Sequence, residues 1–169
     1  LAHYPHGPMG APVIYPQQQG MPVSHNGAMW PFVTAYGLKA AALGRNVSVA
    51  DAAYDTLVRG ASLNLSNMEN LEWLSGQPLL LDEKNPSLIG PVINSRRQLW
   101  SVGAYLGMVV ENVFGVTVTD TGIRVRPFIT AKLRRETFGK SDGIRLHGLA
   151  LRGKRLDVTI DLPATSHDE

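Results

Sequence analysis

The stretch from Ser95 to Gly115 reads SRRQLWSVGAYLGMVVENVFG, and it decides the fold class of the chain. Apolar residues from Trp100 to Met108 recur every three or four positions, which is the spacing of one helix face. The first four residues match a capping box, and the final glycine is a typical helix stop. We therefore predict a helix over residues 96–114, with Trp100 on its apolar, core-facing side.

Three more helices are expected upstream of this stretch. Apolar residues at helical spacing predict helices over residues 29–43 and 49–62. Gly44 is a plausible end for the first, and Ser48 begins a capping-box pattern for the second. A third, short helix is predicted over residues 66–74.

Beyond residue 116 the pattern changes to the two-residue period of strands. Residues 123–126, 144–147 and 156–162 alternate between apolar and polar side chains. The segment LRGKR at residues 151–155 lies between the last two runs and predicts a hairpin turn. Antiparallel strands are therefore expected after residue 120.

This order of elements predicts two domains and a mainly α fold with a β tail. Residues 1–115 would form the helical domain, with the Pro-rich residues 1–24 as its entry loop. Residues 116–169 would form a small antiparallel β domain. Helices followed by strands argue against alternating βαβ units.

The bulk composition excludes several classes of protein. Hydrophobic residues make up 44% of the chain and charged residues 18%, which is enough to bury a core. The net charge is +2, and the densest basic stretch, residues 132–135, is too short to indicate a nucleic-acid surface. No apolar run approaches the ~20 residues that cross a bilayer, so no membrane partner is expected.

Cofactors and metals are not expected either. The chain has no cysteine, its five histidines are dispersed, and it has no glycine-rich phosphate loop. The absence of cysteine leaves the cellular compartment undecided. The first residues contain neither an initiator Met nor a signal pattern, so we expect the chain to be the later part of a longer protein.

Three segments combine residue types that carry carbohydrate chemistry. They are SHNGAMWP at residues 24–31, ENLEWLSG at residues 69–76 and GPVINSRRQLWS at residues 90–101. Each motif alone is weak because short patterns recur by chance, but three in order are more specific.

In these segments the chain resembles the six-hairpin glycosidases, among them glucoamylases, processing mannosyl-oligosaccharide glucosidases and the glucosidase half of glycogen debranching enzymes. Their conserved Glu is followed by an acidic or amide residue and a Gly, as Glu69 is by Glu72 and Gly76 here. The resemblance implies the last hairpins of an (α/α)6 barrel followed by a small β domain. The chain departs from the pattern at Leu99, where a small residue is more usual.

The resemblance also implies a function, that of an inverting glycoside hydrolase acting on the ends of α-linked glucosides or similar sugars. Glu69 would be the general base that activates water. The general acid would come from an upstream segment that this chain does not contain. The two carboxyl groups of an inverting enzyme stand ~6.5–9.5 Å apart.

Substrate contacts are expected from side chains near these motifs. Aromatic rings pack on the C–H faces of sugars, and amide, imidazole and carboxylate groups bond their hydroxyls. The expected substrate-binding residues are His25, Asn26, Trp30, Trp73 and Glu72.

Each of these assignments has a purely structural alternative. Glu69 ends the capping-box pattern that begins at Ser66, and Asn26 is a suitable helix cap. Trp30 suits a helix core, and Glu72 is a second candidate for the base. The chain as a whole could instead be a non-catalytic carbohydrate-binding or interaction module, or a relative of enzymes that use phosphate in place of water.

The expected partners follow from the same resemblance. They are a carbohydrate substrate and either the upstream part of the same protein or a second chain that completes the barrel. The helices predicted here are too few to surround a substrate, so apolar surface should remain for such a partner to cover.

Overall fold

The computed structural model describes residues 7–16, 18, 23–78 and 95–164. The chain divides into two compact units, Leu1–Met108 and Val109–Glu169. The predicted boundary lies after residue 115, whereas the structure divides within the helical stretch that precedes Gly115.

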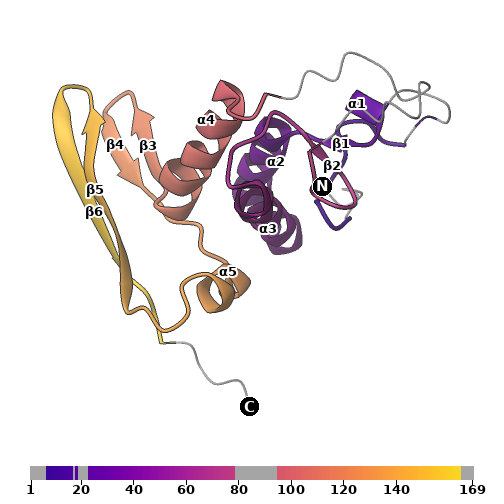
Figure 1. The fold of residues 1–169 in the computed structure, drawn as a ribbon. Coiled ribbons are helices and arrows are strands. Elements are labelled where there is room, and N and C mark those ends of the chain that lie inside the picture. The colour runs from indigo at the N-terminus through magenta and orange to yellow at the C-terminus, as the bar shows by residue number, and fades with distance from the viewer. Residues whose placement is uncertain (1–6, 17, 19–22, 79–94, 165–169) are drawn as a thin grey trace. The chain divides into compact units, whose positions relative to one another are not determined.

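Unit 1 consists mainly of helices (Figure 1). Its elements are α1 (Val23–Asn26), β1 (Ala28–Met29), α2 (Pro31–Leu43), α3 (Val47–Asn64), β2 (Leu71–Glu72) and α4 (Leu99–Gly107). The helices expected over residues 29–43 and 49–62 are thus observed as α2 and α3.

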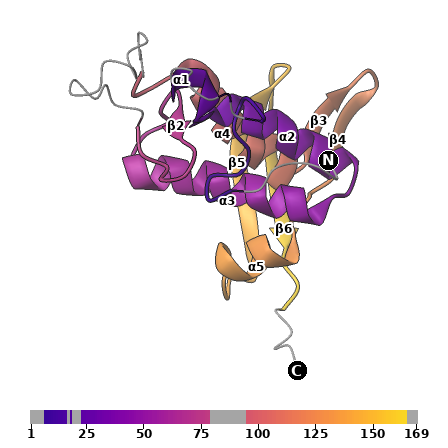
Figure 2. The same ribbon diagram turned by 90° about the vertical axis from the view of Figure 1, so that its right-hand side faces the viewer.

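The pair α2–α3 forms the centre of unit 1, and the two helices lie side by side in both views (Figure 2). Helix α2 starts at Pro31, a residue suited to a first helical turn because it has no N–H to leave unbonded. Its end is marked by Gly44, whose N–H donates to the carbonyl of Ala40 at 3.0 Å. The second helix is capped by Asn46, not by the Ser48 box, because the Asn46 side chain accepts the N–H of Val49 at 3.1 Å.

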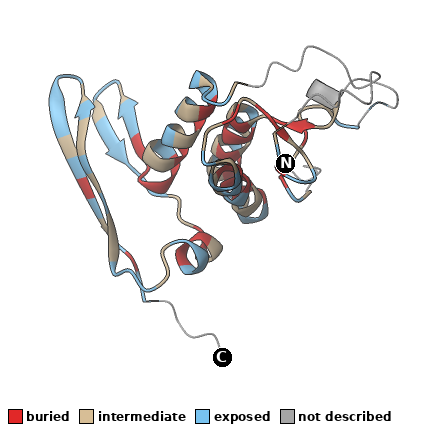
Figure 3. Ribbon diagram, in the orientation of Figure 1, coloured by how far each residue is buried: buried red, intermediate tan, exposed pale blue. Residues whose placement is uncertain are grey.

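The core between these helices is made of apolar side chains that helical spacing places on the facing sides. Figure 3 shows buried residues along both helices. Leu38, Ala41, Val49, Ala50, Ala53, Tyr54 and Leu57 are all at most 3% exposed. Burial raises the pKa of the Tyr54 hydroxyl, and the nearby Asp51 raises it further.

The short helix predicted over residues 66–74 is wrong. Helix α3 ends at Leu65, which adopts a left-handed conformation with φ of 48°. The chain then forms a turn and β2, in which Leu71 pairs with Met29 of β1. The pairing buries both side chains in a cluster with Met9 and Met68, and this tertiary contact outweighs the local helical pattern.

The helix that decided the sequence prediction is present but starts and ends differently. Helix α4 begins at Leu99, and the capping box at residues 95–98 is not formed, because the Ser95 N–H donates to Glu69 and the Gln98 N–H donates to the carbonyl of Asn67. A π-helical segment, Met108–Val113, follows directly, and the N–H of Phe114 donates to the carbonyl five residues earlier. Gly115, with φ of 66°, ends the helical stretch as expected.

Unit 2 begins within the π-helical segment and continues with two hairpins and a short helix between them. Strands β3 (Val116–Thr119) and β4 (Gly122–Val125) pair antiparallel, as do β5 (Gly143–Leu151) and β6 (Lys154–Asp161). The hairpin turn expected at residues 151–155 is confirmed. Arg152 and Gly153 both have positive φ, which is typical of a type I′ turn.

The hairpin β5–β6 contains a bulge. Leu146 lies opposite Val158, but the next paired residue on β5 is Leu149, opposite Leu156. Strand β5 therefore carries one residue more than β6 over this interval. The Asp157 carboxylate fills the bulge, since it accepts the N–H of Gly148 at 2.6 Å and pairs with the His147 imidazole at 2.9 Å.

The predicted fold class, mainly α with a β tail and the last hairpins of an (α/α)6 barrel, is wrong. The structure is mixed, with 40% in helices and 23% in strands. The described strands form three separate two-stranded antiparallel sheets, and one of them lies within the helical unit. A helix, α5 (Ala131–Glu136), lies between the hairpins of unit 2. Neither β1–β2 nor α5 was predictable from the spacing of apolar residues in the sequence, because each element is too short to show a strand or helix period.

Candidate functional site

The described parts of the three motif segments converge in unit 1, while residues 90–94 of the third segment lie outside the described residues. The second segment pairs with the first through β1–β2, and the N–H of Trp73 donates to the carbonyl of Gly27 at 2.9 Å. The third segment joins the second through Glu69 and Ser95, and joins the first through a ring contact between Trp100 and Trp30. Residues as far apart in sequence as Trp30 and Trp100 are therefore in contact.

Glu69 is bonded to Ser95 by its main chain and by its side chain. Its N–H donates to the Ser95 carbonyl at 2.8 Å, and its Oε2 atom accepts the Ser95 N–H at 3.0 Å. The side chain is half-buried. The helix-capping alternative for Glu69 is wrong, because no helix begins in this segment.

Further hydrogen bonds join the same two segments. The N–H of Gln98 donates to the carbonyl of Asn67 at 3.1 Å, and the Ser66 hydroxyl donates to the carbonyl of Arg96. We refer to the bonds between residues 66–69 and 95–98 as the clasp. The clasp fixes the Glu69 carboxylate next to the start of α4.

Four rings gather where α2 and α4 begin, and we call them the aromatic cluster: His25, Trp30, Phe32 and Trp100. The His25 and Trp30 rings are stacked with centroids 5.2 Å apart. Trp30 lies 5.9 Å from Trp100 at an interplanar angle of 33°, and Phe32 lies 5.5 Å from Trp100. His25 is exposed, and Trp30 is half-buried. Trp100, which was predicted to face the core, is 43% exposed. Trp30 is thus neither an isolated surface residue nor a fully buried core residue.

Asn26 is the last residue of α1 and does not cap α2, whose first flanking residue is Trp30. Its side-chain amide bonds both main-chain groups of Gln18, accepting the N–H and donating to the carbonyl, each at 2.6 Å. The structure therefore gives Asn26 the role of fixing the loop at residue 18.

The Glu72 carboxylate is directed at its own turn. It accepts the N–H of Leu74 at 3.0 Å and that of Ser75 at 2.6 Å. Partial burial acts to raise the pKa of Glu72, but the hydrogen bonds from the Ser75 side chain and from these two amides outweigh it and lower the pKa. Both carboxylate oxygens of Glu72, the second candidate for the base, are thus bonded within its own turn.

Trp73 packs into the interior of unit 1. Its indole N–H donates to the carbonyl of Gly10 at 2.8 Å, and its ring packs against the methionine cluster around Met29. The ring also covers Gly7, where an added Cβ atom would lie 2.6 Å from it. These contacts explain why glycine occupies that position of the loop.

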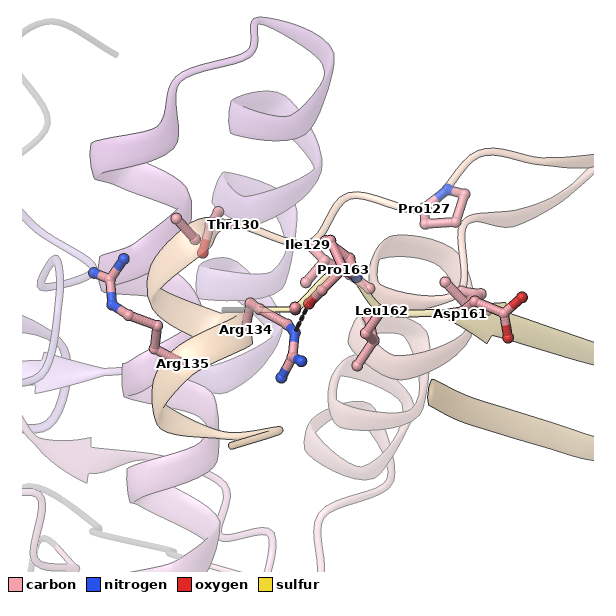
Figure 4. Close-up of a pocket in the computed structure, with 11 residues that line it drawn as sticks. Pro127, Ile129, Thr130, Arg134, Arg135, Asp161, Leu162 and Pro163 are labelled. Atoms are coloured by element: carbon pink, nitrogen blue, oxygen red, sulfur yellow. Dashed lines mark hydrogen bonds between the residues drawn. The ribbon is translucent and has the colours of Figure 1, made fainter. Parts of the chain in front are cut away.

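A hollow of about 550 Å³ lies in unit 2 between α5 and the end of β6 (Figure 4). Its lining is largely apolar and includes Ile129, Leu162 and Pro163. The Arg134 side chain at its wall is 8% exposed, and its nitrogens donate to the carbonyls of three residues: Gly139, Ser141 and Pro163. This hollow has a structural role, because the buried Arg134 side chain at its wall is already bonded to main-chain carbonyls.

In residues 7–16, 18, 23–78 and 95–164, no group of three His, Cys, Asp or Glu side chains is placed to hold a metal ion. None of the helices in the same residues is long and apolar enough to span a membrane.

Comparison of the chain with protein-family models, with curated proteins and with solved structures finds no match. The function is therefore argued from the geometry of the site and from the motifs that meet in it.

Proposed function

We propose that this chain supplies the water-activating part of an inverting glycoside hydrolase that acts on the ends of α-linked glucosides or similar sugars. Glu69 is the general base. The observation that supports the proposal is the Glu69 carboxylate, which Ser95 fixes where the second motif segment joins the third, while the second segment also pairs with the first. The proposal does not depend on an (α/α) barrel.

The hydrogen bonding of Glu69 suits a base. One oxygen, Oε2, accepts the Ser95 N–H, which fixes the orientation of the carboxylate. Among the described residues, no hydrogen bond is made by Oε1, so that oxygen has a lone pair for a water molecule. The half-buried position limits competing solvent.

The proposed reaction needs a second carboxyl group. A general acid protonates the leaving glycosidic oxygen while Glu69 takes a proton from the water that attacks the anomeric carbon. In this proposal the acid belongs to a segment that precedes this chain. The first sugar released from an α-linked substrate is then the β-anomer.

The aromatic cluster provides the sugar contact in this proposal. Sugar rings have an apolar C–H face that packs on aromatic planes, and Trp30 has both partial exposure and ring neighbours that fix it. His25 is exposed beside it and can bond a hydroxyl group.

The test is Glu69→Gln in the protein that carries this chain, assayed with p-nitrophenyl α-glucoside and maltose. Glutamine retains the side-chain oxygen that accepts the Ser95 N–H but cannot take a proton. We expect kcat to fall by at least ~10², the low end for general-base catalysis, with little change in Tm. The anomer released by the unmodified protein is identified by NMR.

The matched control is Glu136→Gln. Glu136 is exposed and lies 3.9 Å from Lys132 in a surface ion pair, which contributes little to stability. This variant should keep the activity of the unmodified protein.

A second candidate function is supported by the clasp itself. Because Glu69 contributes two of the clasp's bonds, its role is also explained by the joining of two loops in a non-catalytic carbohydrate-binding module. Binding of maltose by the unmodified protein without any hydrolysis would support that alternative, and a fully active Glu69→Gln variant would contradict the proposed base.

A further inference from the structure

Strand β6 is an edge strand of its sheet. Among the described residues it pairs with β5 alone, so its other side has no partner strand (Figure 1). Strand β5 also has a free side, but the bulge between Leu146 and Leu149 interrupts it, which hinders pairing there. No bulge interrupts β6 over Lys154–Asp161, and a regular free edge is a template for another strand.

The free main-chain groups of β6 belong to its odd-numbered residues. The N–H of Leu162, directly after the strand, donates to the carbonyl of Asp142 across the hairpin at 2.8 Å. In an antiparallel ladder the main-chain groups of successive residues point alternately to the two sides of a strand, so those of the even-numbered residues point at β5. The groups that point away from β5 are those of Arg155, Asp157, Thr159 and Asp161.

The side chains of the same odd-numbered residues form the exposed face of β6, and its even-numbered side chains form the apolar face. All four odd-numbered residues are exposed, whereas Val158 is buried and its apolar neighbours are half-buried. The exposed face has a positive charge at one end, Arg155, and a negative charge at the other, Asp161. Among the described residues no ion pair involves either of them.

We infer that β6 pairs antiparallel with β6 of a second copy of this chain, in a register centred on Val158. A twofold axis through this centre joins the two hairpins into one four-stranded sheet, and each contact occurs twice. Arg155 then lies opposite Asp161 of the partner subunit, so an opposite-charge pair stabilises each end. The odd-numbered residues lie opposite one another, as main-chain hydrogen bonding across the new ladder requires.

The residues between the two charge pairs also match in this register. Asp157 lies opposite Thr159 of the partner subunit, whose hydroxyl can donate to the carboxylate. On the apolar face, Leu156 lies opposite Ile160 of the partner subunit, and Val158 lies opposite its own copy. The seam therefore places polar side chains on the exposed face and apolar side chains on the other.

Other registers of the same pairing are less favourable. Because odd-numbered residues must lie opposite one another, the strands can shift only in steps of two residues. One such step places Asp157 opposite Asp157 of the partner subunit, and the step in the other direction places it opposite Asp161 of the partner subunit. Like charges directly opposite each other are destabilising, and a larger shift leaves little of either strand paired. The charges of β6 thus select this register and a second copy as the partner.

The first test is amide hydrogen exchange of the whole chain, measured by NMR at a low and a high protein concentration. The four odd-numbered amides of β6 should exchange at least ~10-fold more slowly at the high concentration, because each donates across the dimer. The even-numbered amides bond β5 in the monomer and should be protected at both concentrations. Association through the exposed apolar side chains of unit 1 would leave the odd-numbered amides unprotected. Exchange of these amides that does not depend on concentration would overturn the inference.

The second test reverses the charges at the ends of the seam. Arg155→Asp places like charges opposite each other at both ends, so it should raise the Kd of the dimer at least ~10-fold at low ionic strength. Asp161→Arg should do the same. The double variant restores opposite charges with their positions exchanged, so its Kd should return to within ~3-fold of that of the unmodified chain. Sedimentation velocity over a range of concentrations measures the Kd of each variant.

The matched control is Arg145→Asp. Arg145 is exposed on β5 opposite Thr159, so it lies on the same hairpin but away from the free edge of β6. Its reversal should leave the Kd unchanged, and melting curves establish that all variants remain folded. The pairing is wrong if either single reversal at the seam leaves the Kd unchanged, if the double variant stays monomeric, or if Arg145→Asp weakens the dimer equally.

Discussion

Arg134 stabilises unit 2 from its interior. Its guanidinium group donates to carbonyls that follow α5 and to the carbonyl of Pro163, which follows β6. A planar group with several fixed donors can bond carbonyls from separate segments at once. The side chain thus joins the helix, the loop after it and the end of the last strand.

We predict that Arg134→Met destabilises unit 2 by at least ~2 kcal/mol, because the carbonyls lose their donors in a buried position. Arg135→Met is the control, since Arg135 is exposed, and it should change stability by no more than ~0.5 kcal/mol. Hydrogen exchange of the β6 amides measures both. Equal protection in the two variants would contradict the role of Arg134.

The candidate site was only partly predictable from its residues. Residue type and order indicated His25, Trp30 and Glu69, and the structure brings the segments that carry them together. The clasp was not predictable, because each of its bonds uses at least one main-chain group and joins residues at least 26 positions apart. The same holds for Arg134, because nothing in its basic sequence neighbourhood indicates that this side chain is buried.

At the scale of elements, long periodic helices were predictable and short elements were not. The apolar period identified α2, α3 and α4, because a helix of nine or more residues repeats its face several times. The predicted starts of α3 and α4 differ from the observed ones. A capping pattern in the sequence does not form where another side chain caps the helix, or where a distant carbonyl accepts the N–H group instead. The two-residue strands β1 and β2 exist only through their pairing with each other.

The molecule as a whole leaves many apolar side chains of unit 1 in contact with solvent. Tyr36, Leu43, Leu65 and Leu99 are 67%, 89%, 92% and 82% exposed. Soluble monomers rarely expose large contiguous apolar patches. We propose that a preceding segment of the same protein, or a second chain, covers part of this surface.

This proposal predicts that the 169-residue chain alone self-associates and binds a hydrophobic dye such as ANS. Sedimentation velocity over a range of concentrations measures the association. A longer polypeptide that contains the preceding segment should bind less dye and form no species larger than the β6-paired dimer. A sharply melting monomer of the chain alone, without dye binding, would contradict the proposal.

The bulge in the β5–β6 hairpin determines where strand β5 tolerates the deletion of a single residue. Before the bulge the apolar residues of β5 occupy even positions, Ile144 and Leu146, and after it they occupy odd positions, Leu149 and Leu151. Removal of Gly148 restores one uninterrupted alternation and leaves the two-residue turn intact.

A single-codon deletion that would normally move half a strand to the wrong face is therefore harmless at this position. We expect the Gly148 deletion to fold with a Tm close to that of the unmodified chain. The deletion of Ala150 shortens the strand equally but turns Leu149 outward and Gly148 inward, so its Tm should fall by several degrees. Equal melting of the two deletions would refute this account. The Gly148 deletion carries a different penalty, since a straight strand without a bulge offers a continuous edge for pairing between molecules, and its aggregation rate should rise.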